Sequence, residues 1–240
     1  MRLFAAFLMA CSLLFAGNGM FQSVPENEAE LLQQGPAKAY CPNCGMYLPK
    51  FYKTNHAVRL KNGETRQYCS IHCLVEEREM GYLRDKRNEI AEVLVVDTAS
   101  KKFINAHKAH YVVGSHIKGT MSATSKYAFT SKADAEAFAK ENGGTLTDHK
   151  GAYGAALADF EKDMQMIKKN RGNMMYKLGE ELFEESCNKA AFKEFHAHTL
   201  GELKAEIRDS GACGANLGDA KLQGIALYYW DIQLDRFGKH

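Results

Sequence analysis

Two cysteine pairs in the first third of the chain have the residue types and the spacing of a metal site. Cys41 and Cys44 lie in the run Tyr-Cys-Pro-Asn-Cys-Gly-Met, and Cys69 and Cys73 follow farther along the chain. Two cysteine pairs arranged in this way are a fairly strong indication of metal binding. Four thiolates suit a tetrahedral zinc ion, so a structural zinc knuckle is one interpretation. Oxidation of the pairs to plain disulfides is another.

Two methionines favour copper(I) over zinc. Met46 lies two residues after Cys44, and in an extended segment both side chains point to the same side. Met121 follows Gly119-Thr120 in a loop without an apolar pattern that would explain it. Thioether sulfur is a poor zinc ligand and a good copper(I) ligand, and it cannot form a disulfide. We therefore predict Cu(I) as the bound ion and Zn as the alternative. The candidate ligands are Cys44, Met46, Met121, Cys41, Cys69 and Cys73.

Other sulfur and imidazole side chains have lower priority. His72 lies between two candidate ligands, but a surface position at a helix start is the preferred interpretation. Four methionines follow later, at positions 164, 166, 174 and 175. Spacings of two and one do not place side chains on one face of a helix, so we expect roles in the core or the linker.

The elements around the first cysteines are expected to be a hairpin and a helix. Residues 56–60 and 65–68 alternate like strands across Asn62-Gly63, which is a strong hairpin sequence. Residues 71–80 have helical spacing, which puts the second cysteine pair at a strand-to-helix junction. The partial positive charge of a helix N-terminus favours thiolate there.

A second unit with a similar order of elements follows. Strands are expected at residues 102–105, 109–113, 126–129 and 145–147, and a helix at residues 133–140. The last segment is expected to be mainly helical, with one helix beginning at the capping box of Thr199 and Glu202. The predicted fold class is therefore α+β, with two small strand-rich modules, each with one helix, and then a small all-helical domain.

Residues 39–150 resemble the NosL family, the copper accessory proteins of nitrous oxide reductase. The resemblance depends on the Cys41–Met46 run, the hairpin with Cys73, and the second-unit sequence Ala-His-Lys-Ala-His-Tyr-Val-Val-Gly-Ser with the helix after it. It implies an extracytoplasmic protein of two small α+β modules that binds copper(I), together with Cys44, Met46 and Met121 as ligands. The family's Gly-Pro-Met loop is Gly-Thr-Met here, a small departure.

The resemblance also implies partners and further ligands. The partners would be a copper client protein, by default nitrous oxide reductase in denitrification, and its ABC-type maturation system. The run from Gln67 to Cys73 is similar to TRASH/YHS-type metal knuckles, which use a cysteine pair with three residues between. That similarity supports Cys69 and Cys73 as ligands.

The N-terminal segment predicts export. Residues 1–20 have a short positive start and an apolar run too short to span a bilayer, as in a signal peptide. The run Leu-Met-Ala-Cys ending at Cys11 is an alternative lipobox, which would leave a lipoprotein with its lipid on Cys11. Residues 21–38 are expected to be a linker. The predicted location is periplasmic, with membrane contact only through the leader or the lipid.

The C-terminal third has its own resemblance. Residues 151–172 are expected to be a helical linker, and residues 173–240 resemble a small class I cytochrome c. The haem attachment run Cys-x-x-Cys-His is absent, so we expect no haem. Cys187 and Cys213 are then free to form a disulfide. A second metal site of these cysteines with His196 and His198 is the alternative.

Composition excludes several function classes. The chain has 31 Lys and Arg against 29 Asp and Glu, which argues against nucleic acid as a partner. A thiol-disulfide oxidoreductase would use Cys41 and Cys44 at a helix start, but the residues after Cys44 do not predict a helix. We therefore expect no enzyme. The predicted function is an extracytoplasmic copper(I) metallochaperone, most simply for nitrous oxide reductase, and the alternative is a zinc-knuckle structural or docking protein of the cell envelope.

Overall fold

The computed structural model describes residues 20–237. The candidate lipidation residue Cys11 and the predicted leader up to residue 19 lie outside the described residues. Two small antiparallel sheets and a set of helices make up the described part, so the predicted α+β class is confirmed. Within residues 20–237, no helix has both the length and the apolar character needed to cross a membrane.

The first sheet has four antiparallel strands in the order β2-β1-β3-β4. Its strands are β1 (His56–Leu60), β2 (Thr65–Tyr68), β3 (Ile90–Val96) and β4 (Phe103–Asn105). The predicted hairpin joins β1 to β2, with His56 opposite Tyr68 and Gly63 at φ 91° in the turn. Most side chains of β1 and of the second half of β3 are buried, and two residues separate β2 from α1 (Ile71–Glu79).

One strand lies in a different sheet from the one we predicted from the sequence. Residues 103–105 were expected in the second unit, but they form β4 and pair with β3. The reason is a tight turn in which the Asp97 carboxylate accepts hydrogen bonds from the backbone N–H and hydroxyl of Ser100. This turn, with Lys101 at φ 61°, folds the chain back on β3.

The second sheet has three antiparallel strands in the order β6-β5-β7. They are β5 (His110–Val113), β6 (Lys126–Phe129) and β7 (Thr145–Thr147), and α2 (Lys132–Asn142) packs against them. The Ser131 hydroxyl caps α2 by accepting from the backbone N–H of Asp134 at 3.3 Å. Gly143, at φ 71°, ends the helix.

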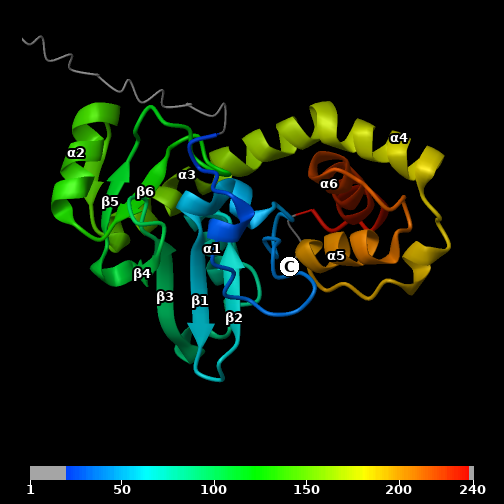
Figure 1. Cartoon of the computed structure of the whole chain (residues 1–240), viewed down its shortest axis with the longest axis horizontal. Helices are drawn as coiled ribbons and strands as arrows, with labels where there is room; N and C mark the ends of the chain where they lie inside the picture. Colours follow the sequence, from blue (N-terminus) through cyan, green and yellow to red (C-terminus); the bar gives the residue numbers. More distant parts are fainter. Residues whose placement is uncertain (1–19, 238–240) are drawn as a thin grey trace, which may run out of the picture.

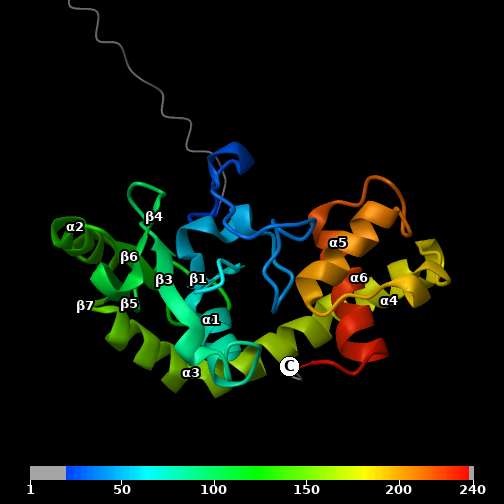
Figure 2. The same cartoon turned by 90° about the horizontal axis from the view of Figure 1, so that it is seen from below.

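A single long helix connects the sheets to the C-terminal part of the chain (Figures 1 and 2). It consists of α3 (His149–Asn170), a π-helical turn (Arg171–Met175) and α4 (Tyr176–Ser186). Ala152 and Ala156 of α3 are buried in the same core as the first sheet. The segment expected as a helical linker is thus packed along its first turns against the strand-rich part.

The C-terminal part contains α4, α5 (Leu200–Ser210) and α6 (Asp219–Leu227), followed by a second π-helical turn (Tyr228–Gln233). The capping box of Thr199 and Glu202 begins α5 as the sequence predicts. Helices α4 and α6 approach very closely where Gly179 faces Gly224. Cys187 and Cys213 are joined by a disulfide. Short 3-10 helices span Glu26–Glu28, Leu48–Thr54, Arg87–Glu89, Ala106–Lys108 and Ala191–Glu194.

Candidate metal centre

A tight loop carries the first cysteine pair. Tyr40 and Tyr47 pair as an isolated antiparallel bridge at its base. Inside the loop, the backbone N–H of Cys41 donates to the Met46 carbonyl at 2.9 Å, and the N–H of Gly45 donates to the Cys41 carbonyl at 2.9 Å. Gly45 has φ 70°, a left-handed conformation in which a Cβ would be strained. The sequence Cys-Pro-Asn-Cys-Gly-Met therefore forms a turn that directs both thiols inward.

The second cysteine pair lies where β2 meets α1. Cys69 directly follows β2, and Cys73 lies in the first turn of α1. The Thr54 hydroxyl donates to the Cys69 carbonyl at 2.8 Å and fixes this junction. The unpaired backbone N–H groups of a helix start lie close to Cys73 and stabilise negative charge on sulfur.

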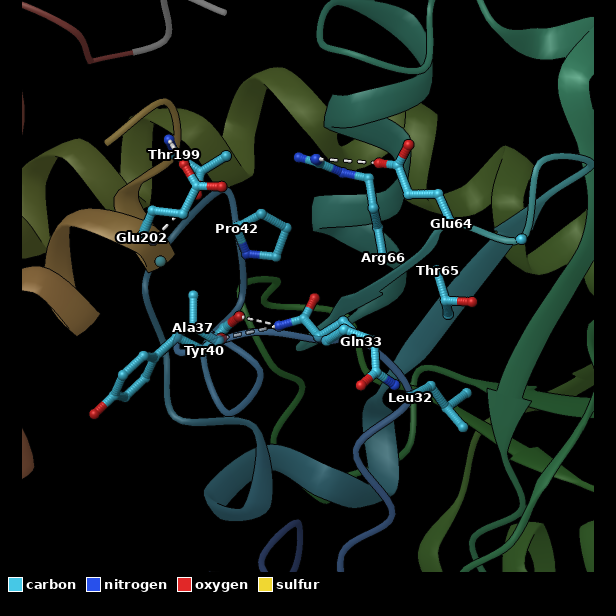
Figure 3. A pocket seen from close by; sticks show the side chains of 13 residues that line it. Leu32, Gln33, Ala37, Tyr40, Pro42, Glu64, Thr65, Arg66, Thr199 and Glu202 are labelled. Carbon is cyan, nitrogen blue, oxygen red and sulfur yellow. Dashed lines mark hydrogen bonds and ion pairs between the residues drawn. The ribbon is translucent and has the colours of Figure 1, made fainter. Parts of the chain in front are cut away.

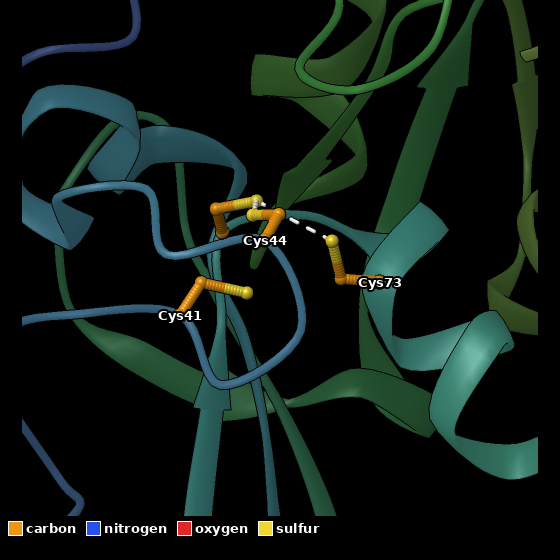
Figure 4. Close-up of side chains that lie close together, drawn as sticks. Cys41, Cys44 and Cys73 are labelled. Atoms are coloured by element: carbon orange, nitrogen blue, oxygen red, sulfur yellow. Dashed lines mark hydrogen bonds between the residues drawn. The ribbon is translucent and has the colours of Figure 1, made fainter. Parts of the chain in front are cut away.

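The four cysteine sulfurs converge on one point (Figure 4). All four Sγ atoms lie within 4.8 Å of one another. The Sγ atoms of Cys44 and Cys69 are 3.4 Å apart, and those of Cys69 and Cys73 are 3.6 Å apart. A tetrahedral ion with metal–sulfur bonds of about 2.3 Å requires sulfurs about 3.8 Å apart. All four are free thiols and buried, so the cluster has the size and the donor set for one soft or borderline ion.

Hydrogen bonds among the four thiols make their pKa values differ. Burial alone would raise the pKa of Cys41, but hydrogen bonds from the other three thiols outweigh it and hold that pKa well below its usual range. Burial and the contact with Cys41 raise the pKa of Cys69. Contacts with Cys41 and Cys44 raise the pKa of Cys73. One thiolate shared among three thiols is the expected state, and a bound cation would replace their protons.

The two predicted methionine ligands lie beside this cluster. Met46 and Met121 line a cavity of about 660 Å³ whose wall also includes Cys44. Both methionines are half-buried and pack against the core that contains the cysteines. Met121 has φ 58°, an uncommon conformation for a residue other than glycine. Cys44 is thus the one cysteine of the cluster that also lines the methionine-bearing cavity.

Three further methionines line the same cavity, which their spacing along the chain did not predict. They are Met166 of α3 with Met174 and Met175 of the π-helical turn. In a regular α-helix, Met175 would lie about 180° around the axis from Met166. A π-turn closes i→i+5 hydrogen bonds, so it winds less per residue and brings Met175 back toward the same side. No sequence pattern indicated this turn.

The C-terminal helices hold the first cysteine loop from outside. The Lys204 ammonium donates to the Gly45 carbonyl at 3.0 Å, and the Gln223 amide donates to the Cys44 carbonyl at 2.8 Å. The backbone N–H of Gly201 donates to the Pro42 carbonyl at 3.3 Å. Burial lowers the pKa of Lys204, while Asp219, at 2.6 Å, favours the charged ammonium. Sequence reasoning missed this contact because its partners are far apart along the chain.

Among residues 20–237, the histidines lie outside the sulfur cluster. His72 is buried, stacks on Phe160 with ring centroids 5.0 Å apart, and has its Nδ1 3.7 Å from an Asp163 carboxylate oxygen. It is therefore not the surface residue that the sequence suggested, and it is not one of the four side chains that converge in the cluster. His56 contacts the Thr54 carbonyl and the Tyr111 hydroxyl.

The alternative second metal site at the C-terminus does not form. The disulfide takes up both of its thiols, Cys187 and Cys213. His196 and His198 are exposed and line a different cavity.

A polar cavity of about 350 Å³ is lined in part by Tyr40 and Pro42 of the cysteine loop (Figure 3). Its wall combines the segment around Gln33, the β1–β2 hairpin and the start of α5. The Gln33 amide donates to the Tyr40 carbonyl at 2.7 Å, and Arg66 lies 3.8 Å from the Glu64 carboxylate. Because the residues of its wall bring no sulfur, this cavity offers nothing to a soft metal ion.

Comparison with known proteins identifies the family of the part of the chain that contains the cysteine cluster. The model of the NosL family matches residues 34–156, just over half of the chain. The chain belongs to the NosL family. A solved structure, the copper chaperone NosL from Shewanella denitrificans, is 26% identical, covers 50% of this chain and 93% of that one, and has a TM-score of 0.38. A search of curated proteins found no match.

The residues matched by the NosL family model contain the predicted ligands but only part of the cavity wall. All six predicted sulfur ligands lie inside the matched residues. Three of the methionines in the cavity wall, together with Lys204 and Gln223, lie beyond them. The part of the chain outside the NosL match therefore contributes both to the cavity wall and to the support of the cysteine loop.

Proposed function

We propose that this protein is a copper(I) chaperone whose cargo is bound where the cysteine cluster meets the methionine-lined cavity. The observation that carries the proposal is the position of Cys44. Its sulfur belongs to the four-cysteine cluster, and its side chain also lines the cavity that contains Met46 and Met121. Thiolate and thioether ligands together suit copper(I), whereas zinc gains nothing from thioethers. Membership of the NosL family supports the same function.

Release of the cargo would proceed by ligand exchange. Cys44 is the anionic anchor, and Met46 and Met121 are neutral ligands that a partner's sulfur can replace one at a time. Both methionines are half-buried, so one side of the cargo can be approached through the cavity. Lys204 and Gln223 hold the carbonyls of Gly45 and of Cys44 itself, which keeps Cys44 in place while the other ligands change.

The location and the client belong to this proposal. The leader sequence and the disulfide between Cys187 and Cys213 support a periplasmic protein, because such bonds persist in oxidising compartments. The family resemblance supports nitrous oxide reductase as the client and an ABC-type system as the maturation partner. None of these functions requires the chain to be an enzyme.

A second candidate function has its own observation. Four buried thiols with sulfurs spaced for a tetrahedral ion also describe a structural zinc knuckle. In that case zinc would bind tightly, chelation would unfold the domain, and both methionines would be dispensable.

Parallel titrations of copper(I) and zinc, without oxygen and against chelators of known affinity, distinguish the two functions. The chaperone proposal predicts tight copper(I) binding that is lost in Cys44→Ser and weakened about tenfold or more in Met121→Leu. Met80→Leu is the matched control, because Met80 is exposed at the end of α1 and lies outside the cavity wall. Tight zinc with no effect of Met121→Leu would replace the chaperone with the zinc knuckle.

A further inference from the structure

One face of α3 contacts both α1, which begins at the second cysteine pair, and the loop of residues 114–125, which carries Met121. This face presents Asp159, Phe160 and Asp163, which are three or four residues apart and therefore lie on the same side of the helix. All three lie beyond the NosL match, which ends at residue 156, and none of them lines the methionine-bearing cavity. Their contacts are thus additions of this chain to the matched part.

Asp163 joins the two segments through its carboxylate. The residue is buried, and one carboxylate oxygen accepts a hydrogen bond from the Ala123 N–H at 3.1 Å. The other oxygen lies 3.7 Å from Nδ1 of His72 in α1. Burial raises the pKa of Asp163, but the contacts with His72 and Ser122 outweigh it and keep that pKa below its usual value. One buried carboxylate therefore fixes the loop against the helix that begins at the cysteines.

A pair of hydroxyl groups ties the other side of Met121 to the second cysteine pair. Thr120 is buried, and its hydroxyl oxygen lies 2.8 Å from that of Thr54, within hydrogen-bonding distance. The Thr54 hydroxyl also contacts the Cys69 carbonyl at 2.8 Å. Two short contacts therefore connect the residue before Met121 to a cysteine of the cluster, and this connection does not depend on the shape of the cavity.

Met121 itself has a backbone conformation that needs such support. Its φ is 58°, and a residue other than glycine keeps this conformation only where the surrounding structure fixes it. The buried Lys126 ammonium holds the loop further, by donating to the Ser122 hydroxyl at 3.0 Å and to the Asp159 carboxylate at 2.9 Å. The direction of the Met121 side chain therefore depends on contacts on both sides of the residue.

We propose that Asp163 and Thr120 are positioning residues that keep the Met121 thioether beside the cysteine cluster. The inference rests on the proposed function, in which Met121 is an exchangeable copper(I) ligand. Neither side chain lines the cavity, and copper(I) prefers sulfur to carboxylate or hydroxyl oxygen, so both act through Met121. Zinc held by four cysteines has no use for a thioether. Both residues therefore matter for copper(I) binding and not for zinc binding.

The test is chelator competition without oxygen on the purified protein, with copper(I) and with zinc. Asp163→Leu and Thr120→Val remove the polar contacts and keep a similar volume. Each should lower copper(I) affinity about tenfold, as Met121→Leu does, and leave zinc affinity unchanged. Asp163→Asn should restore copper(I) affinity, because its amide oxygen is still an acceptor. Glu161→Leu and Thr145→Val, both at exposed positions, are the matched controls and should change neither affinity.

A double-mutant cycle separates positioning from general destabilisation. If Asp163 acts through Met121, the variant Asp163→Leu/Met121→Leu should bind copper(I) no more weakly than Met121→Leu alone. X-ray absorption of selenomethionine-labelled protein carrying one copper(I) gives a direct readout. Thr120→Val should show fewer copper–selenium contacts than the wild type, because its Met121 no longer reaches the ion.

The failure of this inference differs from the failure of the proposed function. Additive losses in the cycle, a loss of zinc affinity in either variant, or loss of copper(I) in Asp163→Asn would overturn the positioning role. So would wild-type copper(I) affinity in Thr120→Val, a small change that keeps the test decisive if Asp163→Leu does not fold. All of these results leave the chaperone proposal intact. If Met121→Leu itself binds copper(I) as the wild type does, the proposed ligand set fails.

Discussion

Replacing Lys204 with methionine tests how the C-terminal helices hold the cysteine loop. The Lys204 ammonium is fully buried and donates three hydrogen bonds, to the Gly45 carbonyl at 3.0 Å, to Gln223 Oε1 at 2.8 Å and to Asp219 at 2.6 Å. Methionine fills a similar volume but donates nothing. The substitution therefore removes the charge and the hydrogen bonds with little change in packing.

The magnitude follows from the acceptors that lose their donor. Each buried acceptor without a partner costs about 1–3 kcal/mol. Two of the three acceptors, on Gly45 and Gln223, lie against the loop, whereas the Asp219 side chain is 36% exposed and can be rehydrated. We expect Lys204→Met to lower the free energy of unfolding by about 3 kcal/mol. Because the Gly45 carbonyl directly follows Cys44, copper(I) affinity should also fall at least tenfold, which corresponds to about 1.4 kcal/mol of binding free energy.

Urea unfolding of the metal-free protein measures the first quantity, and chelator competition measures the second. The midpoint should fall while the slope stays constant, because the surface exposed on unfolding is unchanged. Lys221→Met in the exposed face of α6 is the matched control and should change stability by less than about 0.5 kcal/mol. A loss below about 1 kcal/mol in Lys204→Met, or unchanged copper(I) affinity, would refute the idea that these contacts hold the loop.

Three further predictions concern the rest of the fold. Burial, with a contribution from a neighbouring histidine, lowers the pKa of His56 to about 3. The folded state therefore keeps His56 neutral, whereas the unfolded state takes up a proton below about pH 6.5. The free energy of unfolding should therefore fall on acidification, by about 2 kcal/mol from pH 7 to pH 5. Unfolding of the metal-free protein at both pH values checks this, and a His56→Gln variant with the same pH dependence would contradict it. Gly179→Ala should lower the free energy of unfolding by about 1–3 kcal/mol, because a Cβ there would lie 2.1 Å from the Gly224 carbonyl oxygen. Gly154→Ala, in open space on α3, should instead raise it by up to about 1 kcal/mol. Equal midpoints of urea unfolding for the two variants would contradict the close helix contact. Removing the disulfide with Cys187→Ala/Cys213→Ala should cost about 3.5 kcal/mol, as expected for the closed loop, and should leave the tight copper(I) ion bound, a result checked by unfolding and by titration.

Local sequence signals predicted the parts of the fold that depend on neighbouring residues. Asn62-Gly63 predicted the β1–β2 hairpin, and the Thr199 capping box predicted the start of α5. Failures came from longer-range pairing. Residues 103–105 belong to the first sheet because the turn at Asp97 folds them back on β3. The β-strand propensity of a segment does not determine which strand it pairs with.

The candidate site shows the same division. Spacing along the chain was enough to bring the cysteines together, because a turn and a helix start place both pairs at the hairpin. Helical spacing did not predict that three of the later methionines line one cavity, because a π-turn from Arg171 to Met175 interrupts the regular helix. Lys204 and Gln223 contact the loop from 159 and 179 residues away, and no local pattern reveals such contacts.

The unbroken helix from α3 to α4 has a consequence for how this chain can change length. The expected boundary between residues 172 and 173 falls inside its π-helical turn, and no flexible connection separates the two sides. Deleting one residue from a regular helix rotates everything after it by about 100° and shifts it by about 1.5 Å. Such a change would turn Lys204 and Gln223 away from the cysteine loop. An insertion or deletion at this point must therefore preserve helical phase if the C-terminal helices are to keep their contacts with the cysteine loop.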